Sequence, residues 1–223
     1  ALISGGAPLN PEIGMFFTAL GLQILQGYGQ TETSPSVSVN RPSTMKLHTV
    51  GPPMKDVQVK IADDGEILVR GDLVMLGYWN NEEATADTIR DGWVHTGDSA
   101  VIDEDGYIFL RDRIKDMIIS GGENIYPIEI ENALSQHPAV ADVAVVGIPC
   151  ENFGETPLAC VVLAEGKQLN EAEMIEFLRN DLAGYKIPRQ LKVFAELPRN
   201  PTGKILKKVL REPYWENQER AIN

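Results

Sequence analysis

Cysteine and histidine are scarce in this chain of 223 residues. It has two cysteines, Cys150 and Cys160, and three histidines. Two cysteines without a spacing motif do not make a disulfide framework, and scattered histidines do not make a metal cluster. The sequence therefore favours reduced thiols and a cytoplasmic location, with peripheral attachment to a membrane left open.

Long apolar runs and an excess of positive charge are lacking as well. No stretch has the length and composition of a transmembrane segment, and no signal peptide is recognisable. Lys and Arg number 20 against 32 Asp and Glu, which gives a net charge of −12. This charge argues against general binding to nucleic acid, so an anionic ligand must be held by local donors.

The first part of the chain reads as strand, helix and strand. An apolar pair before Ser-Gly-Gly at 4–6 predicts a buried strand and a tight turn, and Asn10 before a proline predicts a helix start. A second strand is expected at 22–26. We interpret residues 1–35 as the end of a truncated α/β subdomain. Because the chain opens inside an apolar run without Met, we expect its N-terminal half to be missing.

A glycine pair follows this second strand. Gly27 and Gly29 flank a tyrosine, but Glu32 stands where a dinucleotide fingerprint needs its third glycine, so we reject that reading. The two glycines would let the backbone approach a ligand closely. Thr31 and Glu32 offer a hydroxyl and a carboxylate side by side, which suits a phosphate and its Mg²⁺. An ordinary polar loop is the alternative.

Residues 36–112 carry β signals. Hairpins are expected at 57–69 and 101–110, and several hairpins at this spacing predict a small barrel or sandwich. Asp98, behind a glycine, could accept hydrogen bonds from a ligand diol or cap a turn. His95 nearby is interpreted as a packing or supporting residue, since a single histidine is seldom a catalytic base.

The charged stretch 111–122 separates this β-rich part from a mixed one. It is interpreted as a domain junction, with a solvated loop as the alternative. Residues 117–223 are predicted to form a separate small α+β domain. Its expected elements are helices from Pro127 and from the Asn170–Glu173 capping box to Gly184, strands at 140–148, 158–163 and 190–197, and a last helix at 204–211.

Lys204 lies in Pro-Thr-Gly-Lys at 201–204. This is no P-loop, because Pro198 replaces the first glycine and Ile205 replaces the required Ser or Thr. We expect a lysine at the positive end of a short helix, where it can hold an anion. A solvent-facing lysine is the alternative.

Taken together, seven stretches resemble the acyl-adenylate-forming family of acyl-CoA synthetases, adenylation domains and luciferases. They occur in the family's order over nearly the whole chain. They are Ser-Gly-Gly-Ala-Pro-Leu at 4–9, Gln-Gly-Tyr-Gly-Gln-Thr-Glu at 26–32, the Gly-Glu-Ile run at 65–71, the Gly-Trp to Gly-Asp run at 92–98, Asp-Arg-Ile-Lys-Asp at 112–116, Ser-Gly-Gly-Glu-Asn at 120–124, and Pro-Arg-Asn-Pro-Thr-Gly-Lys at 198–204.

The resemblance implies a role for each candidate residue. Thr31, Glu32 and Lys204 would be catalytic, with Glu32 holding Mg²⁺ and Lys204 bridging the substrate carboxylate and phosphate. Asp98 would grip the ribose hydroxyls of ATP. Gly5, Gly6 and Ala7 would line the adenine, Tyr28 would stack on it, and Thr31 would touch the α-phosphate. The remaining implied residues are Gln26, Gly27 and Gly29 in the ATP site, Arg113 assisting at the ribose, Lys115 in a hinge at 113–116, and Ser120, Gly121 and Gly122 along a CoA pantetheine tunnel.

The family's upstream phosphate loop and most of its acyl pocket are absent from the sequence. The resemblance therefore implies the C-terminal part of an ATP-dependent carboxylic acid:CoA ligase, inactive alone, whose C-terminal domain rotates between half-reactions. A fatty acid is the expected substrate, because residues 114–118 resemble fatty-acid-type members. The alternatives are an adenylation domain that loads a carrier protein, an oxidising relative, and a non-catalytic partner-binding fragment.

Overall fold

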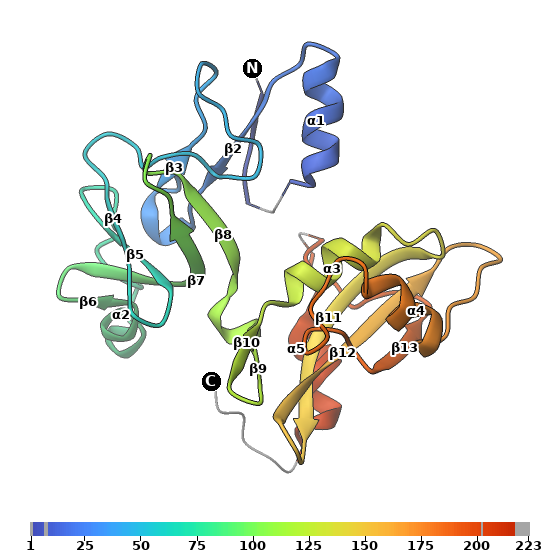
Figure 1. The fold of residues 1–223 in the computed structure, drawn as a ribbon. Helices are drawn as coiled ribbons and strands as arrows, with labels where there is room; N and C mark the ends of the chain where they lie inside the picture. Colours follow the sequence, from blue (N-terminus) through green and yellow to red (C-terminus); the bar gives the residue numbers. More distant parts are fainter. Residues whose placement is uncertain (1, 7–8, 202, 217–223) are drawn as a thin grey trace. The chain divides into compact units, whose positions relative to one another are not determined.

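The computed structural model describes residues 2–6, 9–201 and 203–216 (Figure 1). The fold divides into two units, Ala1–Arg111 and Asp112–Asn223. Each unit is described by itself. No helix of the described residues combines the length and apolar character needed to cross a membrane.

The first unit opens with a three-stranded sheet in the order β1-β2-β3. Strand β1 (Leu2–Ser4) pairs in parallel with β2 (Ile24–Tyr28), and β3 (Ser38–Val39) pairs antiparallel to β2. Helix α1 (Pro11–Ala19) connects the parallel pair and lies beside it (Figure 1). The carboxamide of Asn10 accepts a 2.8 Å hydrogen bond from the Glu12 amide, which confirms the predicted N-cap.

Large apolar side chains of this segment are exposed. Ile3 of β1 is 74% exposed and Phe16 of α1 is 60% exposed. The segment therefore leaves apolar surface uncovered, as expected of two strands and one helix that cannot bury a core alone.

The second sheet of this unit is open and has five strands. Its order is β4-β5-β7-β6, and β8 also pairs with β7. The predicted barrel is therefore wrong for the described residues, which form no closed barrel. The strands are β4 (Gln58–Ile61), β5 (Glu66–Arg70), β6 (Ile89–Arg90), β7 (Trp93–Ile102) and β8 (Ile108–Arg113), with helix α2 at Glu82–Thr88.

One core joins the two sheets of the first unit. Tyr28 of β2 packs in a buried cluster with Ile67 and Val69 of β5 and Val94 of β7. Fully burying such an aliphatic side chain stabilises a fold by about 1.5–3 kcal/mol. The cluster therefore fixes the end of β2 against the second sheet.

The second unit is an α+β domain around one five-stranded sheet. The sheet runs β10-β9-β12-β11, and β13 adds in parallel to β12. Its elements are η2 (Ile114–Asp116), β9 (Ile118–Ser120), β10 (Glu123–Ile125), α3 (Pro127–Ser135), β11 (Val140–Cys150), β12 (Gly154–Leu163), α4 (Glu171–Leu178), β13 (Gln190–Phe194), α5 (Lys207–Arg211) and η3 (Glu212–Tyr214).

Both faces of this sheet are covered. Val145 of β11 packs toward Leu134 of α3 and Met174 of α4, whereas its neighbour Val146 packs in the cluster that contains Leu210 of α5. Successive residues of a strand point to opposite faces, so burial on both sides explains the run without polar side chains at 143–148.

Two elements of the second unit, α4 and β13, end earlier than expected. The Asn170–Glu173 capping box is confirmed, but α4 ends at Leu178 rather than near Gly184. Beyond it the chain continues only as turns, with the Leu182 amide bonded to the Leu178 carbonyl at 3.0 Å. Strand β13 ends at Phe194, three residues before the expected end.

Candidate active site

Two turns lie together at one edge of the first sheet. β1 and β2 are parallel, with Ser4 opposite Gln26, so the turns that follow them leave the same edge. A Cβ added at Gly5 would lie 3.5 Å from the Gly27 carbonyl oxygen, and Gly6 has φ +81°. The predicted ATP-binding residues Gly5, Gly6, Gln26 and Gly27 are thus brought together, whereas Ala7 lies outside the described residues.

Tyr28, the last residue of β2, touches the predicted ribose-binding residue. Its hydroxyl donates a 2.7 Å hydrogen bond to Oδ2 of Asp98 in β7. The Tyr28 ring itself is 9% exposed and belongs to the unit's core. Two motifs separated by seventy residues of sequence therefore meet at one carboxylate.

Gly29 lies where the backbone of residues 35–36 passes close to it. A Cβ at this position would lie 1.6 Å from the Pro35 carbonyl oxygen. The 35–36 backbone therefore fills the space into which a side chain at this position would point. The glycine allows the tight return of the chain after β2.

Thr31 and Glu32 lie in η1 (Thr31–Thr33), directly after the glycine pair. The Glu32 carboxylate accepts a 2.7 Å hydrogen bond from the Tyr78 hydroxyl. This bond, together with partial burial, raises the pKa of Tyr78 above its ordinary value. Tyr78 thereby fixes the carboxylate on the loop that carries Thr31.

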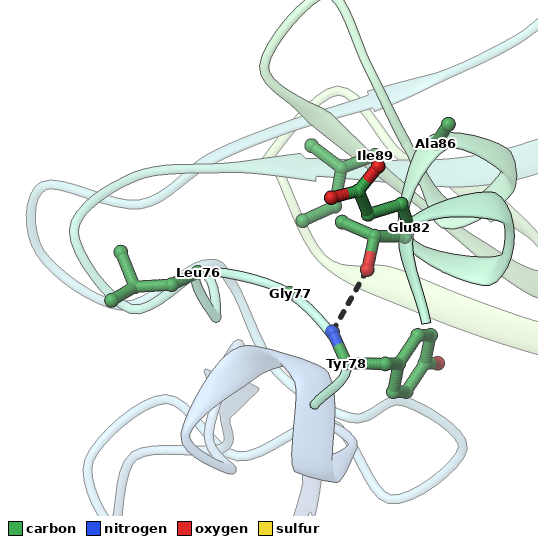
Figure 2. Close-up of a pocket in the computed structure, with 7 residues that line it drawn as sticks. Leu76, Gly77, Tyr78, Glu82, Ala86 and Ile89 are labelled. Atoms are coloured by element: carbon green, nitrogen blue, oxygen red, sulfur yellow. Dashed lines mark hydrogen bonds between the residues drawn. The ribbon is translucent and has the colours of Figure 1, made fainter. Parts of the chain in front are cut away.

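Tyr78 also borders an open, mostly apolar pocket between residues 76–78 and helix α2. Figure 2 shows the Tyr78 ring at one end and Leu76 extending away from it. The Tyr78 amide donates a 2.9 Å hydrogen bond to the Thr85 hydroxyl, which ties the loop to the helix. The loop that holds Glu32 in place is thus itself anchored.

A single protein carboxylate suits Mg²⁺ that arrives with a nucleotide. Within residues 2–6, 9–201 and 203–216, no three His, Cys, Asp or Glu side chains gather as a metal site. Mg²⁺ is commonly held by one or two carboxylates together with substrate phosphates. Glu32 offers one such carboxylate.

The predicted hinge lies at the start of the second unit. Lys115 is the middle residue of η2, and its carbonyl accepts a 3.0 Å hydrogen bond from Arg211 of α5. The same guanidinium pairs with Asp116 at 3.1 Å. Arg113, the predicted ribose-assisting residue, ends β8 immediately before η2. The Lys115 carbonyl is therefore held by α5 of the second unit.

A cluster of buried charged side chains joins α5 to α3. Lys207 of α5 lies 2.8 Å from Glu131 of α3, and the two side chains are 16% and 12% exposed. Burial raises the pKa of Glu131 and of Asp112. Burial acts to lower the pKa of Lys207, but Glu131 and Asp112 more than offset it, so its pKa rises. The cluster holds a protonated lysine between two carboxyl groups.

The predicted tunnel residues form a tight hairpin. Ser120 ends β9, and Gly121 and Gly122 make the turn into β10 with φ +61° and +87°. The Gly121 amide donates a 2.8 Å hydrogen bond to the Phe153 carbonyl. A Cβ at Gly121 would lie 3.3 Å from the Phe153 ring, so little space is available there for a larger residue.

Lys204 lies on a turn, three residues before α5. Its amide bonds to the Asn200 side chain at 2.8 Å, and its carbonyl accepts the Asn200 amide at 2.9 Å. The expected helix from 204 is wrong, because residues 204–206 fold back on 198–200 and the helix begins at Lys207. Lys204 itself is exposed and precedes the N-cap of α5, Leu206, by two residues.

The sequence did not predict three residues that hold parts of the candidate site in place. Tyr78 holds Glu32, Arg211 holds the Lys115 carbonyl, and Glu66 binds the strand that carries Asp98. Only Glu66 had a sequence signal, since it lies in one of the seven quoted stretches. The other two contacts join distant parts of the chain without a local pattern.

Comparisons with known proteins extend these observations. A model of the AMP-binding enzyme family matches residues 1–79, and a model of the AMP-binding enzyme C-terminal domain matches residues 129–204. A feruloyl-CoA synthase of Amycolatopsis sp is 43% identical over 96% of this chain and 46% of its own length. The long-chain-fatty-acid–CoA ligase FadD13 of Mycobacterium tuberculosis is 40% identical over 95% of this chain and 44% of its own.

Among solved structures, o-succinylbenzoate CoA synthetase (MenE) from Bacillus subtilis, in complex with its acyl-adenylate intermediate, superimposes with a TM-score of 0.88. It is 36% identical, over 93% of this chain and 45% of that one. A second structure of that enzyme holds ATP and a magnesium ion. The chain thus spans about half the length of the relatives it matches. With both family models matched in order and the fold shared, the chain belongs to the AMP-binding, acyl-adenylate-forming enzyme family.

Proposed function

We propose that this chain is the C-terminal part of an ATP-dependent carboxylic acid:CoA ligase. The observation that carries the proposal is the 2.7 Å contact between Tyr28 and Asp98, which joins the glycine-rich turns to a carboxylate suited to a ribose. Family membership supports it, and the relatives named above are CoA ligases or synthases.

In the first half-reaction, a carboxylate oxygen attacks the α-phosphorus of ATP and pyrophosphate leaves, which gives acyl-AMP. Asp98 accepts hydrogen bonds from both ribose hydroxyls, with Arg113 assisting. Thr31 contacts the α-phosphate. Gly5, Gly6 and Ala7 line the adenine, with Tyr28 at its face. Mg²⁺ held at Glu32 would neutralise phosphate charge.

Lys204 supplies positive charge to this step. Its ammonium, placed beside the carboxylate and α-phosphate oxygens, stabilises charge that builds on the pentavalent phosphorus. The two hydrogen bonds between Asn200 and Lys204 support the role, because they fix the main chain of the lysine while its side chain stays exposed.

In the second half-reaction, the CoA thiol attacks the acyl carbon and AMP leaves. Residues 117–223 form a lid that turns about the hinge at 113–116, with Lys115 as pivot. The turn Ser120–Gly122 then lines the pantetheine, since glycine lets a thin chain pass close to the backbone. We place the ligase in the cytoplasm, with peripheral attachment to a membrane as the alternative.

The relatives alone do not decide which acid is the substrate or which thiol is the acceptor. A feruloyl-CoA synthase and a fatty-acid–CoA ligase are of nearly equal identity. We propose a fatty acid because of residues 114–118, and CoA because of the Ser120–Gly122 turn. A carrier protein is the rival acceptor.

The test is AMP release by the full-length ligase. With a fatty acid and ATP, CoA should raise AMP release and yield the thioester, whereas a pantetheinylated carrier protein should not. Faster release with the carrier protein would favour the rival, and a ligase that forms no AMP with any acid would leave only a binding role. The isolated 223-residue chain should make no acyl-CoA, and detectable product would contradict that expectation.

A further inference from the structure

Glu66 spans two strands with both oxygens of its carboxylate. It lies at the start of β5, and its side chain is only 12% exposed. Oε1 accepts a 2.8 Å hydrogen bond from the Gly97 amide, and Oε2 lies 2.6 Å from Nδ1 of His95. Both partners are on β7, immediately before Asp98. The contact also explains His95, which acts here as a supporting residue.

The strand pairing is irregular at this point. Glu66 is opposite Ser99, whereas Leu68 is opposite His95, so β7 uses more residues than β5 to cover the same distance. Gly97, inside this bulge, has φ +70°. Bulges re-aim side chains near functional sites, and here the carboxylate replaces a missing main-chain acceptor.

Thr96 completes the bulge. Its hydroxyl donates a 2.8 Å hydrogen bond to the Ile67 carbonyl and accepts one of 3.2 Å from the Asp98 amide. The amides of Gly97 and Asp98 are thus both held by side chains rather than by the regular ladder. The Asp98 carboxylate emerges directly from this arrangement and meets the Tyr28 hydroxyl.

We propose that Glu66 is a positioning residue for Asp98, and so determines how strongly the ligase binds the ribose of ATP. The proposal rests on the proposed function of Asp98. Glu66 acts through the backbone of Gly97, and its contacts are with protein groups. Its loss should therefore weaken only those interactions that depend on the placement of the Asp98 carboxylate.

The test compares ATP with 2′,3′-dideoxy-ATP, which lacks both ribose hydroxyls, in the full-length ligase. Glu66→Ala should raise the KM for ATP by about 10-fold or more, the size expected for a charge-assisted hydrogen bond. It should change the KM for 2′,3′-dideoxy-ATP by less than about 2-fold, since no hydroxyl contact remains to be lost. A general structural defect would weaken both nucleotides equally, and that result would overturn the proposal.

Two further variants make the comparison decisive. Glu66→Gln keeps an acceptor for Gly97 and an amide for His95, so its KM for ATP should stay within about 3-fold of the parent. A loss as large as that of Glu66→Ala would contradict positioning by geometry. Glu104→Ala, on the exposed β7–β8 turn, is the matched control and should change neither KM.

Asp98→Ala separates this proposal from the proposed function. If Asp98→Ala weakens ATP but not the dideoxy nucleotide while Glu66→Ala changes neither, the positioning role alone fails. If Asp98→Ala also leaves the KM for ATP unchanged, the ribose role of Asp98 fails and the positioning role fails with it.

Discussion

The hydroxyl of Tyr28 and the carboxylate of Asp98 form a 2.7 Å hydrogen bond between the end of β2 and the bulged strand β7. Tyr28→Phe removes only the oxygen and keeps the buried ring. Loss of this bond should lower the free energy of unfolding by about 1 kcal/mol, measured by urea unfolding. In the full-length ligase the KM for ATP should rise, because Asp98 loses a restraint. Tyr185→Phe, at an exposed tyrosine, is the control, and equal effects of both substitutions would contradict the assignment.

Gly29 should tolerate no side chain. In Gly29→Ala the new Cβ would lie 1.6 Å from the Pro35 carbonyl oxygen, so the 35–36 backbone must move. Gly6→Ala meets no atom within 4 Å and suffers only from φ +81°. We expect Gly6→Ala to cost about 1 kcal/mol of unfolding free energy, the usual left-handed penalty, and Gly29→Ala to cost at least about 3 kcal/mol. Similar urea midpoints for the two variants would be inconsistent with the close approach.

Lys207 should be essential to the charge cluster of the second unit. Lys207→Met leaves Glu131 buried without its partner, which should lower the unfolding free energy by about 3 kcal/mol or more at pH 7. Lys208→Met, at an exposed neighbour on the same helix, should cost less than about 0.5 kcal/mol in the same urea titration.

The pH dependence of this deficit follows from the direction of the Glu131 shift. Burial raises the pKa of Glu131 in the folded chain, and removal of Lys207 should raise it further. A carboxyl group with a raised folded pKa stabilises the fold below its unfolded pKa and loses that contribution as pH rises through the folded pKa. The deficit of Lys207→Met should therefore shrink as pH is lowered from 7 toward the ordinary glutamate range. A deficit that grows on acidification would contradict an unpaired buried carboxylate.

Local patterns predicted the elements that depend on local chemistry. The Asn10 cap and the Asn170–Glu173 box follow from short-range hydrogen bonds that the sequence displays directly. Helix α3 begins at Pro127, whose fixed φ suits the first helical position. The ordered motifs likewise predicted the family.

The features that the sequence did not predict depend on contacts between residues far apart in the chain. Residues 204–206 have a helical apolar pattern, yet the Leu206 amide bonds to the Pro198 carbonyl at 2.8 Å, so the turn replaces the first helical residues. The sequence also does not show that the 35–36 backbone returns to Gly29 and leaves no space for a side chain there. The contacts of Glu66, Tyr78 and Arg211 join residues 29 to 96 positions apart, and no periodicity reports them.

The proposed pivot is tested by restricting the backbone. Lys115→Pro fixes φ and limits its neighbour, so it should spare at most one half-reaction, whereas Lys115→Ala should spare both. The two rates are measured separately in the full-length ligase, as pyrophosphate release and as AMP release from supplied acyl-AMP with CoA. Two unimpaired half-reactions in Lys115→Pro would refute the pivot role.

The most direct test of the whole account is Lys204→Ala in the full-length ligase, with Lys208→Ala as control. Pyrophosphate release with acid and ATP should fall by at least about 100-fold, the usual consequence of removing one transition-state charge contact. Conversion of supplied acyl-AMP to acyl-CoA should persist near the parent rate, and Lys208→Ala should change neither reaction. Intact pyrophosphate release in Lys204→Ala would contradict the adenylation mechanism.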